Sequence, residues 1–279
     1  MTVTLPKERV SRNIFVMALL GIATITIIIL SAKINLTKTF SHPGKNQCNV
    51  AHIFLEGELT QSSSEATKPE DKHSYTVSDN VLKQIEEAEN NSTIKGVVLE
   101  IESSGGSPVA GEEIANALKR SEKPNVALIK DIGASAAYFA STGANRIYAS
   151  ALSDVGSIGI TGSYTSKERS NAMKGITYNS LSMGKFKDSG DQDKPLSGEE
   201  RVRLMDTVKK TYDIFVAQVA ENRHLKIEEV YKLADGATYV GNDALKLGLI
   251  DSIGGMTEVK EYLSSQTKED IVLCEVEDR

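Results

Sequence analysis

The sequence predicts an α/β protein with a largely parallel sheet. Three observations carry this prediction: short β-rich apolar runs alternate with segments of helical spacing, glycine and serine turns separate them, and the alternation continues from residue 50 to residue 149. Alternating strands and helices favour parallel pairing, because each helix returns the chain across the sheet. No internal repeat is visible, so residues 50–279 are interpreted as one domain.

The predicted elements follow in order along this domain. The expected strands are short apolar runs: Val50–Leu55, Gly96–Ile101, Asn125–Ile129 and Arg146–Ala149. The expected helices are Val77–Ala88, Pro108–Leu118 and the small-residue segment 135–143. Ser107 suits an N-cap, and Pro108 suits the first helical position, where no N–H is needed. A polar loop is expected over 60–76, a tight turn over Asp131–Ala134, and short helices with turns over 225–265.

A long helix is predicted from the segment Ser197–Glu200 to about Asn222. Serine followed three residues later by glutamate is typical of a capping box, which satisfies two backbone donors at a helix start. Apolar residues at helical spacing predict the buried stripe of this helix: Val202, Met205, Val208, Tyr212, Phe215 and Val219.

The N-terminal segment Ile14–Ala32 contains no charged residue. As a helix it would extend about 28 Å, close to the ~30 Å core of a bilayer. A buried core helix would usually be shorter. A cleaved signal peptide would have an apolar region of only ~7–15 residues followed by small residues. We therefore expect a cytoplasmic tail at 1–13, a transmembrane anchor at 14–32 and a linker at 33–49, although basic residues flank the anchor equally on both sides.

Composition narrows the possible functions. The chain has 279 residues, with 32 Lys+Arg against 38 Asp+Glu and a net charge of -6. This acidic balance argues against a nucleic-acid partner, which requires a surplus of basic residues. The four histidines form no metal-binding motif, so neither a metal nor another cofactor is expected. Cys48 and Cys274 fit either a disulfide, if the domain lies outside the cytoplasm, or two separate thiols.

Two segments could support hydrolytic chemistry. Gly105 and Gly106 follow a buried strand, where a turn could present backbone N–H groups to an oxyanion. Ser135 precedes a small-residue helix, which suits either a nucleophile or an ordinary N-cap. A nucleophilic serine needs a base, which His224 or a lysine of the segment 183–197 could provide. Composition alone favours a solvent-exposed side chain for His224 and for both candidate lysines, Lys185 and Lys187.

Five motifs in order resemble the signal peptide peptidase family of bacterial membrane-bound Ser-Lys proteases, peptidase family S49, in its short single-domain form. The motifs are SSGGSPVAGEEI at 103–114, IGASAAYFASTGANRIYA at 132–149, VGSIGI at 155–160, GKFKDSGDQDKPLSGEER at 184–201 and DALKLGLIDSIGG at 243–255. The resemblance covers about residues 50–260. It implies a ClpP/crotonase-like fold and a membrane-anchored serine endopeptidase that cleaves remnant signal peptides.

The resemblance also implies roles for particular residues. Ser135, in the segment S-x-x-Y, would be the nucleophile, and Lys187 would be the general base. Ala136 and either Gly105 or Gly106 would donate the oxyanion hydrogen bonds, while Ser157 would orient the base lysine. Family members form dome-like homo-oligomeric rings in which a neighbouring protomer supplies the lysine. An inner-membrane location is implied, with the N-terminus in the cytoplasm and the catalytic domain outside.

Two departures from the family pattern are visible. Ser104 stands where a proline is usual before the two glycines, and Ala136-Ala137 replaces a glycine pair after the nucleophile. Neither change removes an N–H or touches the proposed dyad. Three alternatives remain open: an inactive relative acting as a membrane scaffold, a crotonase-like acyl-CoA enzyme, and an α/β-hydrolase that uses Ser135 with His224.

Overall fold

The computed structural model describes residues 48–61 and 75–275, which belong to one compact unit that begins at Cys48. The predicted tail at 1–13, the predicted anchor at 14–32 and nearly all of the linker at 33–49 lie outside the described residues, so these assignments stay predictions. In the two described ranges, no helix combines the length and apolar character needed to cross a bilayer.

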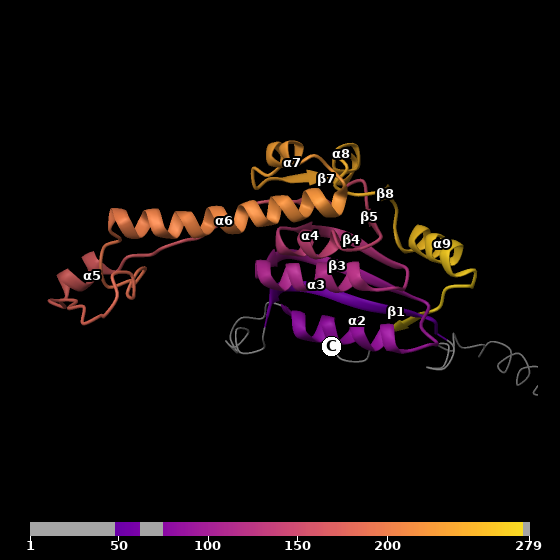
Figure 1. Cartoon of the computed structure of the whole chain (residues 1–279), viewed down its shortest axis with the longest axis horizontal. Helices are drawn as coiled ribbons and strands as arrows, with labels where there is room; N and C mark the ends of the chain where they lie inside the picture. The colour runs from indigo at the N-terminus through magenta and orange to yellow at the C-terminus, as the bar shows by residue number, and fades with distance from the viewer. Residues whose placement is uncertain (1–47, 62–74, 276–279) are drawn as a thin grey trace, which may run out of the picture. The chain divides into compact units, whose positions relative to one another are not determined.

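A largely parallel sheet forms the centre of the fold (Figure 1). Its main order is β2-β1-β3-β4-β5-β8, with bounds Tyr75–Val77, Val50–Thr60, Gly96–Gly106, Asn125–Ala134, Arg146–Ala149 and Ser252–Ile253. Three more strands join it: β6 (Asp154–Gly156), β7 (Thr238–Val240) and β9 (Leu273–Glu275). In the described chain every pairing is parallel except that of β6 with β7. The predicted α/β class with a largely parallel sheet is confirmed.

Helices pack on both faces of the sheet. The larger helices are α2 (Ser78–Asn90), α3 (Pro108–Arg120), α6 (Gly198–Arg223) and α9 (Met256–Thr267). The short ones are α4 (Ala136–Ser141), α5 (Glu168–Met173), α7 (Ile227–Leu233) and α8 (Gly241–Lys246). Alternate residues of a strand face opposite ways. On β3, Leu99 therefore joins the core beneath α2, α3, α4 and α6, whereas Val98 packs with Val259 of α9.

Three strands extend further than the sequence predicts: β1 continues from Leu55 to Thr60, and β3 and β4 continue into the predicted turns. Gly105 and Gly106 end β3 instead of forming a turn, because β1 bulges between Glu56 and Glu58 and keeps its ladder with β3 to the end. The predicted turn at Asp131–Ala134 is likewise the second half of β4, which changes partner there from β5 to β6. The glycines alone suggested turns, but pairing with neighbouring strands keeps both segments extended.

Helix α6 begins with the predicted capping box, in which Ser197 and Glu200 exchange side-chain and backbone hydrogen bonds. The predicted apolar stripe is only partly buried. Phe215 and Val219 pack in the core, whereas Val202 is 71% exposed. We call residues 161–205 the arm: they comprise the segment that carries α5, together with the exposed start of α6.

Cys48 and Cys274 form a disulfide bond, which answers the question that the sequence left open. Their Cα atoms lie 5.1 Å apart because β9 pairs with the beginning of β1, where Ala51 faces Cys274. The bond joins the chain just before β1 to the last described strand.

Candidate active site

Ser135 lies between the end of β4 and the start of α4, in an unusual backbone conformation. Its φ angle is 52°, in the left-handed region that residues other than glycine rarely occupy. The conformation is held on both sides: the Ser135 N–H donates to the Gly156 carbonyl at 2.7 Å, and the Ser135 carbonyl accepts from the Phe139 N–H at 2.9 Å. Strained serines of this kind are found where a side chain must be presented to a ligand.

Gly105 allows β3 to approach this serine closely. A Cβ at position 105 would lie 2.8 Å from Ser135 Cβ and 3.0 Å from the Ala136 nitrogen, and the φ of Gly105 is +106°. The Gly105 N–H donates to Ser103 Oγ at 3.1 Å. The neighbouring Gly106 borders the same cavity as Ser135 and Ala136, whereas Gly105 does not line it. A side chain at position 105 would therefore cover the nucleophile.

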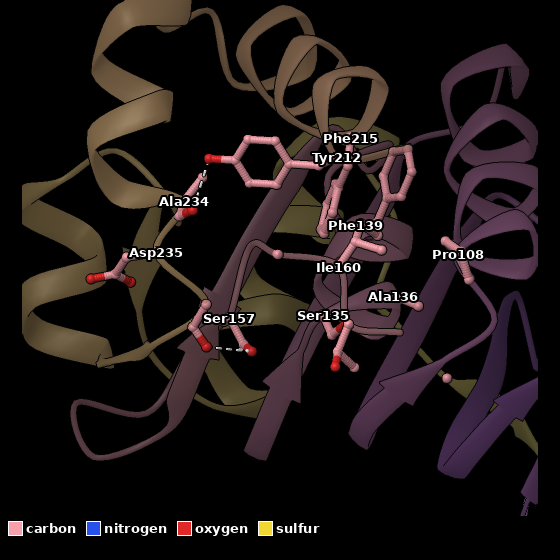
Figure 2. A pocket seen from close by; sticks show the side chains of 14 residues that line it. Pro108, Ser135, Ala136, Phe139, Ser157, Ile160, Tyr212, Phe215, Ala234 and Asp235 are labelled. Carbon is pink, nitrogen blue, oxygen red and sulfur yellow. Dashed lines mark hydrogen bonds between the residues drawn. The ribbon is translucent and has the colours of Figure 1, made fainter. Parts of the chain in front are cut away.

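A cavity of about 450 Å³ opens beside Ser135 (Figure 2). Its walls are apolar and polar in about equal measure. Three large side chains form much of the apolar part: Phe139, Ile160 and Phe215. The polar side chains include Ser135, Ser157, Tyr212 and Asp235. A cavity that combines apolar side chains with a few convergent polar groups is typical of a ligand site.

Ser157 follows β6 and lines the cavity together with Ser135. Its φ is 50°, its N–H donates to the Ala237 carbonyl at 2.9 Å, and its hydroxyl donates to the Gly236 carbonyl at 2.9 Å. Tyr212 holds the same segment from α6, because its hydroxyl donates to the Ala234 carbonyl at 2.9 Å. The role of Ser157 toward a lysine stays a prediction.

Lys187 is exposed and lies in the arm, in a turn over 184–190 whose last three residues are half-buried. It does not line the cavity, and its side chain forms no hydrogen bond or ion pair with the described residues. The nearby Lys185 pairs with Glu199 at 2.7 Å. The structure therefore brings Ser135, Ala136, Gly106 and Ser157 together and leaves Lys187 outside this group within one chain.

Tyr138 and His224 are two further residues that the sequence singled out. Tyr138 is fully buried and donates to the Leu249 carbonyl at 2.9 Å, and burial raises the pKa of its hydroxyl. His224 is the exposed C-cap of α6 and does not line the cavity. No group of three or more His, Cys, Asp or Glu side chains suited to a metal ion occurs in residues 48–61 and 75–275.

The sequence analysis missed several residues of the cavity. Tyr212 and Phe215 were assigned only to the buried stripe of a helix, and Phe139 to a small-residue helix. One signal could have found them. Each of the two segments carries two aromatic residues, Tyr138 with Phe139 and Tyr212 with Phe215, in a chain with only 5% Phe, Trp and Tyr. That signal does not say which aromatic side chains border a cavity.

Comparison with known proteins identifies the family of this chain. The model of peptidase family S49 matches residues 117–269, which is more than half of the chain. The chain belongs to peptidase family S49, and the resemblance to the signal peptide peptidases is confirmed.

Three relatives illustrate the extent of the similarity. A protein named as a protease in Methanocaldococcus jannaschii is 34% identical over 209 residues, which cover 74% of this chain and 66% of the relative. A protein named as a signal peptide peptidase in Enterococcus faecium is 32% identical, over 68% of this chain and 56% of its own. Protease 4 of Salmonella typhi is 31% identical, over 76% of this chain and 34% of its own.

These shares mean that the matched part of the chain spans between about a third and two thirds of these relatives. Among solved structures, a ClpP1 mutant from Listeria monocytogenes aligns with a TM-score of 0.48 and 16% identity, over 73% of this chain and 91% of that one.

Proposed function

We propose that this protein is a membrane-anchored serine endopeptidase in which Ser135 is the nucleophile and Lys187 is the general base. The observation that carries the proposal is the conformation of Ser135, which is held at a φ of 52° beside a cavity of about 450 Å³. Membership of peptidase family S49 supports the reaction class.

Two backbone N–H groups are the proposed oxyanion donors. The Ala136 N–H lies in the first turn of α4, where no acceptor exists within the helix. Gly106 supplies the second donor, since it borders the cavity and the Gly105 N–H is already engaged by Ser103. One such donor is worth roughly a hundred- to a thousandfold in turnover in known serine proteases.

The proposed base comes from a second copy of the chain. The arm exposes several large apolar side chains: Met173, Ile176, Leu181, Met183, Phe186, Val202 and Met205. Leu181 is 100% exposed and Met183 is 94% exposed, which is unusual unless another protein surface covers them. A homo-oligomeric ring would bury these residues and bring Lys187 to the Ser135 of a neighbour. Burial also favours the neutral form of a lysine side chain, which a base requires.

In the proposed reaction, Lys187 accepts the Ser135 hydroxyl proton as the oxygen attacks a peptide carbonyl. The tetrahedral oxyanion accepts hydrogen bonds from Gly106 and Ala136. Lys187 then gives its proton to the leaving amine, which breaks the peptide C–N bond and leaves an acyl-serine. Water, deprotonated by Lys187, hydrolyses this ester and restores the Ser135 hydroxyl.

The proposed substrates are remnant signal peptides in the inner membrane. The apolar part of the cavity beside Ser135, formed by Phe139, Ile160 and Phe215, suits the apolar side chains of such peptides. The apolar segment 14–32 would anchor the domain near them, with the N-terminus in the cytoplasm. The disulfide between Cys48 and Cys274 supports a domain outside the cytoplasm, because disulfides persist in oxidising compartments.

A fluorophosphonate probe tests the dyad on the detergent-solubilised full chain. Wild type should label covalently, whereas Ser135→Ala and Lys187→Ala should not, and Lys185→Ala should label like wild type because Lys185 is already paired with Glu199. Mixing the two inactive variants should restore peptide cleavage, since a mixed ring contains intact pairs of Ser135 and Lys187. Full labelling of Lys187→Ala would contradict the base assignment. No labelling of a folded wild type by two probe chemistries would favour a scaffold.

A further inference from the structure

A second lysine of the arm, Lys194, has surroundings unlike those of Lys187. Its side chain is 20% exposed, and its Nζ lies 3.4 Å from Asp188 Oδ1. The same Nζ donates a hydrogen bond to Glu200 Oε1. Its pKa is raised, first by the hydrogen bond to Glu200 and then by Asp188, so Lys194 stays charged near neutral pH. It is therefore unsuited to act as a base itself.

The Asp188 end of this network fixes the turn that carries Lys187. Asp188 is the next residue in the chain, and its Oδ2 accepts from Ser180 Oγ at 2.6 Å and from the Tyr178 hydroxyl at 3.3 Å. The Ser180 hydrogen bond, with Lys194, lowers the pKa of Asp188, which is therefore a carboxylate near neutral pH. Three side chains thus hold the residue beside the proposed base.

The Glu200 end of the network belongs to the first turn of α6. Glu200 is only 5% exposed, and its Oε2 accepts the Ser197 N–H at 2.8 Å as part of the capping box. The Lys194 backbone is also held, because its carbonyl accepts from the Tyr164 hydroxyl, which donates to the Asp191 carbonyl as well. Lys194 therefore ties a surface turn to the start of a long helix.

We infer that Lys194 is a positioning residue for Lys187: it fixes the turn against α6 and neutralises the carboxylate next to the base. This inference rests on the proposed function, in which Lys187 must lose its proton. An unpaired carboxylate beside a lysine favours the charged ammonium form. Lys194 opposes this stabilisation of the ammonium form in two ways. It balances the charge of Asp188, and it helps to hold the Asp188 carboxylate against Ser180 and Tyr178.

The titratable groups in and around the network are the following. Within it, Tyr178 and Lys194 face Asp188, and Glu200 faces Lys194 from α6. Asp191 lies close enough to Tyr178 to raise the pKa of that hydroxyl, after burial. On the same turn as Lys187, Lys185 is paired with Glu199 from α6. Removing Lys194 therefore leaves the two carboxylates of Asp188 and Glu200 without their cation.

The test is the pH dependence of probe labelling and peptide cleavage, measured on the full chain. Lys194→Met should move the acid limb of both profiles upward by about one pH unit, which is roughly a tenfold loss of rate at a fixed pH on that limb. Lys194→Arg, which keeps the charge, should retain most of the wild-type profile. The double variant Lys194→Met with Asp188→Asn should bring the limb back down, because it also removes the unbalanced carboxylate. Lys185→Met, the matched control on the same turn, should leave the profile unchanged.

Two readouts separate this inference from the proposed function. If Lys187→Ala labels normally, the base assignment fails, whatever Lys194 does. If Lys187→Ala is inactive and folded Lys194→Met keeps the wild-type profile, only the positioning role fails. Circular dichroism and light scattering check folding and assembly of each variant. Should Lys194→Met not fold, Lys194→Gln serves instead, because its amide can still donate a hydrogen bond but carries no charge to balance Asp188. It should shift the limb in the same direction, and an unshifted limb would overturn the role.

Discussion

The two halves of the proposed site are built in different ways. The Ser135 half is part of the packed body, where backbone contacts and glycines leave no room for adjustment: a Cβ at Gly105 would lie 2.8 Å from Ser135 Cβ. The Lys187 half belongs to the arm, where a Cβ at Gly175 or Gly190 would meet nothing within 4 Å. The body is held by apolar burial and the arm by polar side-chain networks.

In the proposed mechanism, the nucleophile is therefore preorganised within one chain, whereas the base depends on assembly. A strained conformation such as that of Ser135 persists only where its surroundings enforce it, which the body does. An exposed turn can be positioned only through its own hydrogen bonds and through a partner surface. Variants in the body should therefore affect catalysis at any protein concentration, and variants of the exposed apolar side chains of the arm should act in a concentration-dependent way.

The largest expected effect comes from Gly105→Ala in the body. The new methyl group would crowd Ser135 and Ala136 at a φ of +106°, and we expect peptide cleavage to fall at least about a hundredfold, as when an oxyanion donor is lost. Gly175→Ala in the arm is the matched control, because its φ is +72° but a methyl group there meets nothing. It should cost only about 1 kcal/mol of stability. Equal activity of the two variants would show that the close approach at Gly105 does not shape the site.

A smaller effect is expected from making the arm polar. Leu181→Ser combined with Met183→Ser should weaken assembly, because burying each such side chain is worth about 1.5–3 kcal/mol, or roughly ten- to a hundredfold in dissociation constant. Light scattering and cleavage rates over a dilution series would measure this, and the lost activity should return at high concentration. Leu152→Ser is the control, since Leu152 is 85% exposed but lies outside the arm. Unchanged assembly of the double variant would place the interface elsewhere.

The smallest expected effect is the response of the arm to acid. The pKa of Glu200 is lowered first by the Lys194 hydrogen bond, and that of Asp188 first by the Ser180 hydrogen bond, from ordinary values of 4.5 and 3.8. A lowered carboxyl pKa contributes stability that is present above the ordinary value and is lost as pH falls through the folded value. Hydrogen exchange, corrected for intrinsic rates, should thus show residues 178–200 losing protection below about pH 4 before the sheet does. Simultaneous loss in both regions would mean that the network does not stabilise the arm.

Much of the body was predictable from sequence because its signals are local. The cap at Ser107, the proline at Pro108 and the apolar strand cores act within a few residues, and the elements they predict are present in the structure. The ends of β3 and β4 were mispredicted. Pairing with β1 and β6, which are distant in sequence, extends these strands to Gly106 and Ala134. The short strands β7, β8 and β9 were missed for the same reason.

By itself, the sequence determined the α/β class, the family through five ordered motifs, and Ser135 and Lys187 as the residues to examine. The α/β class follows from residue type and spacing, whereas the family, and Lys187 in preference to Lys185, follow from the resemblance of those motifs to known proteases. Only the tertiary structure decided that Ser135 adopts a φ of 52°, that Gly105 must lack a side chain, and that aromatic residues of α4 and α6 border a common cavity. It also decided that the apolar stripe of α6 divides into a buried half and an exposed half. The physical reason is that helical periodicity reports which face of a helix is apolar, whereas burial depends on what else folds against that face.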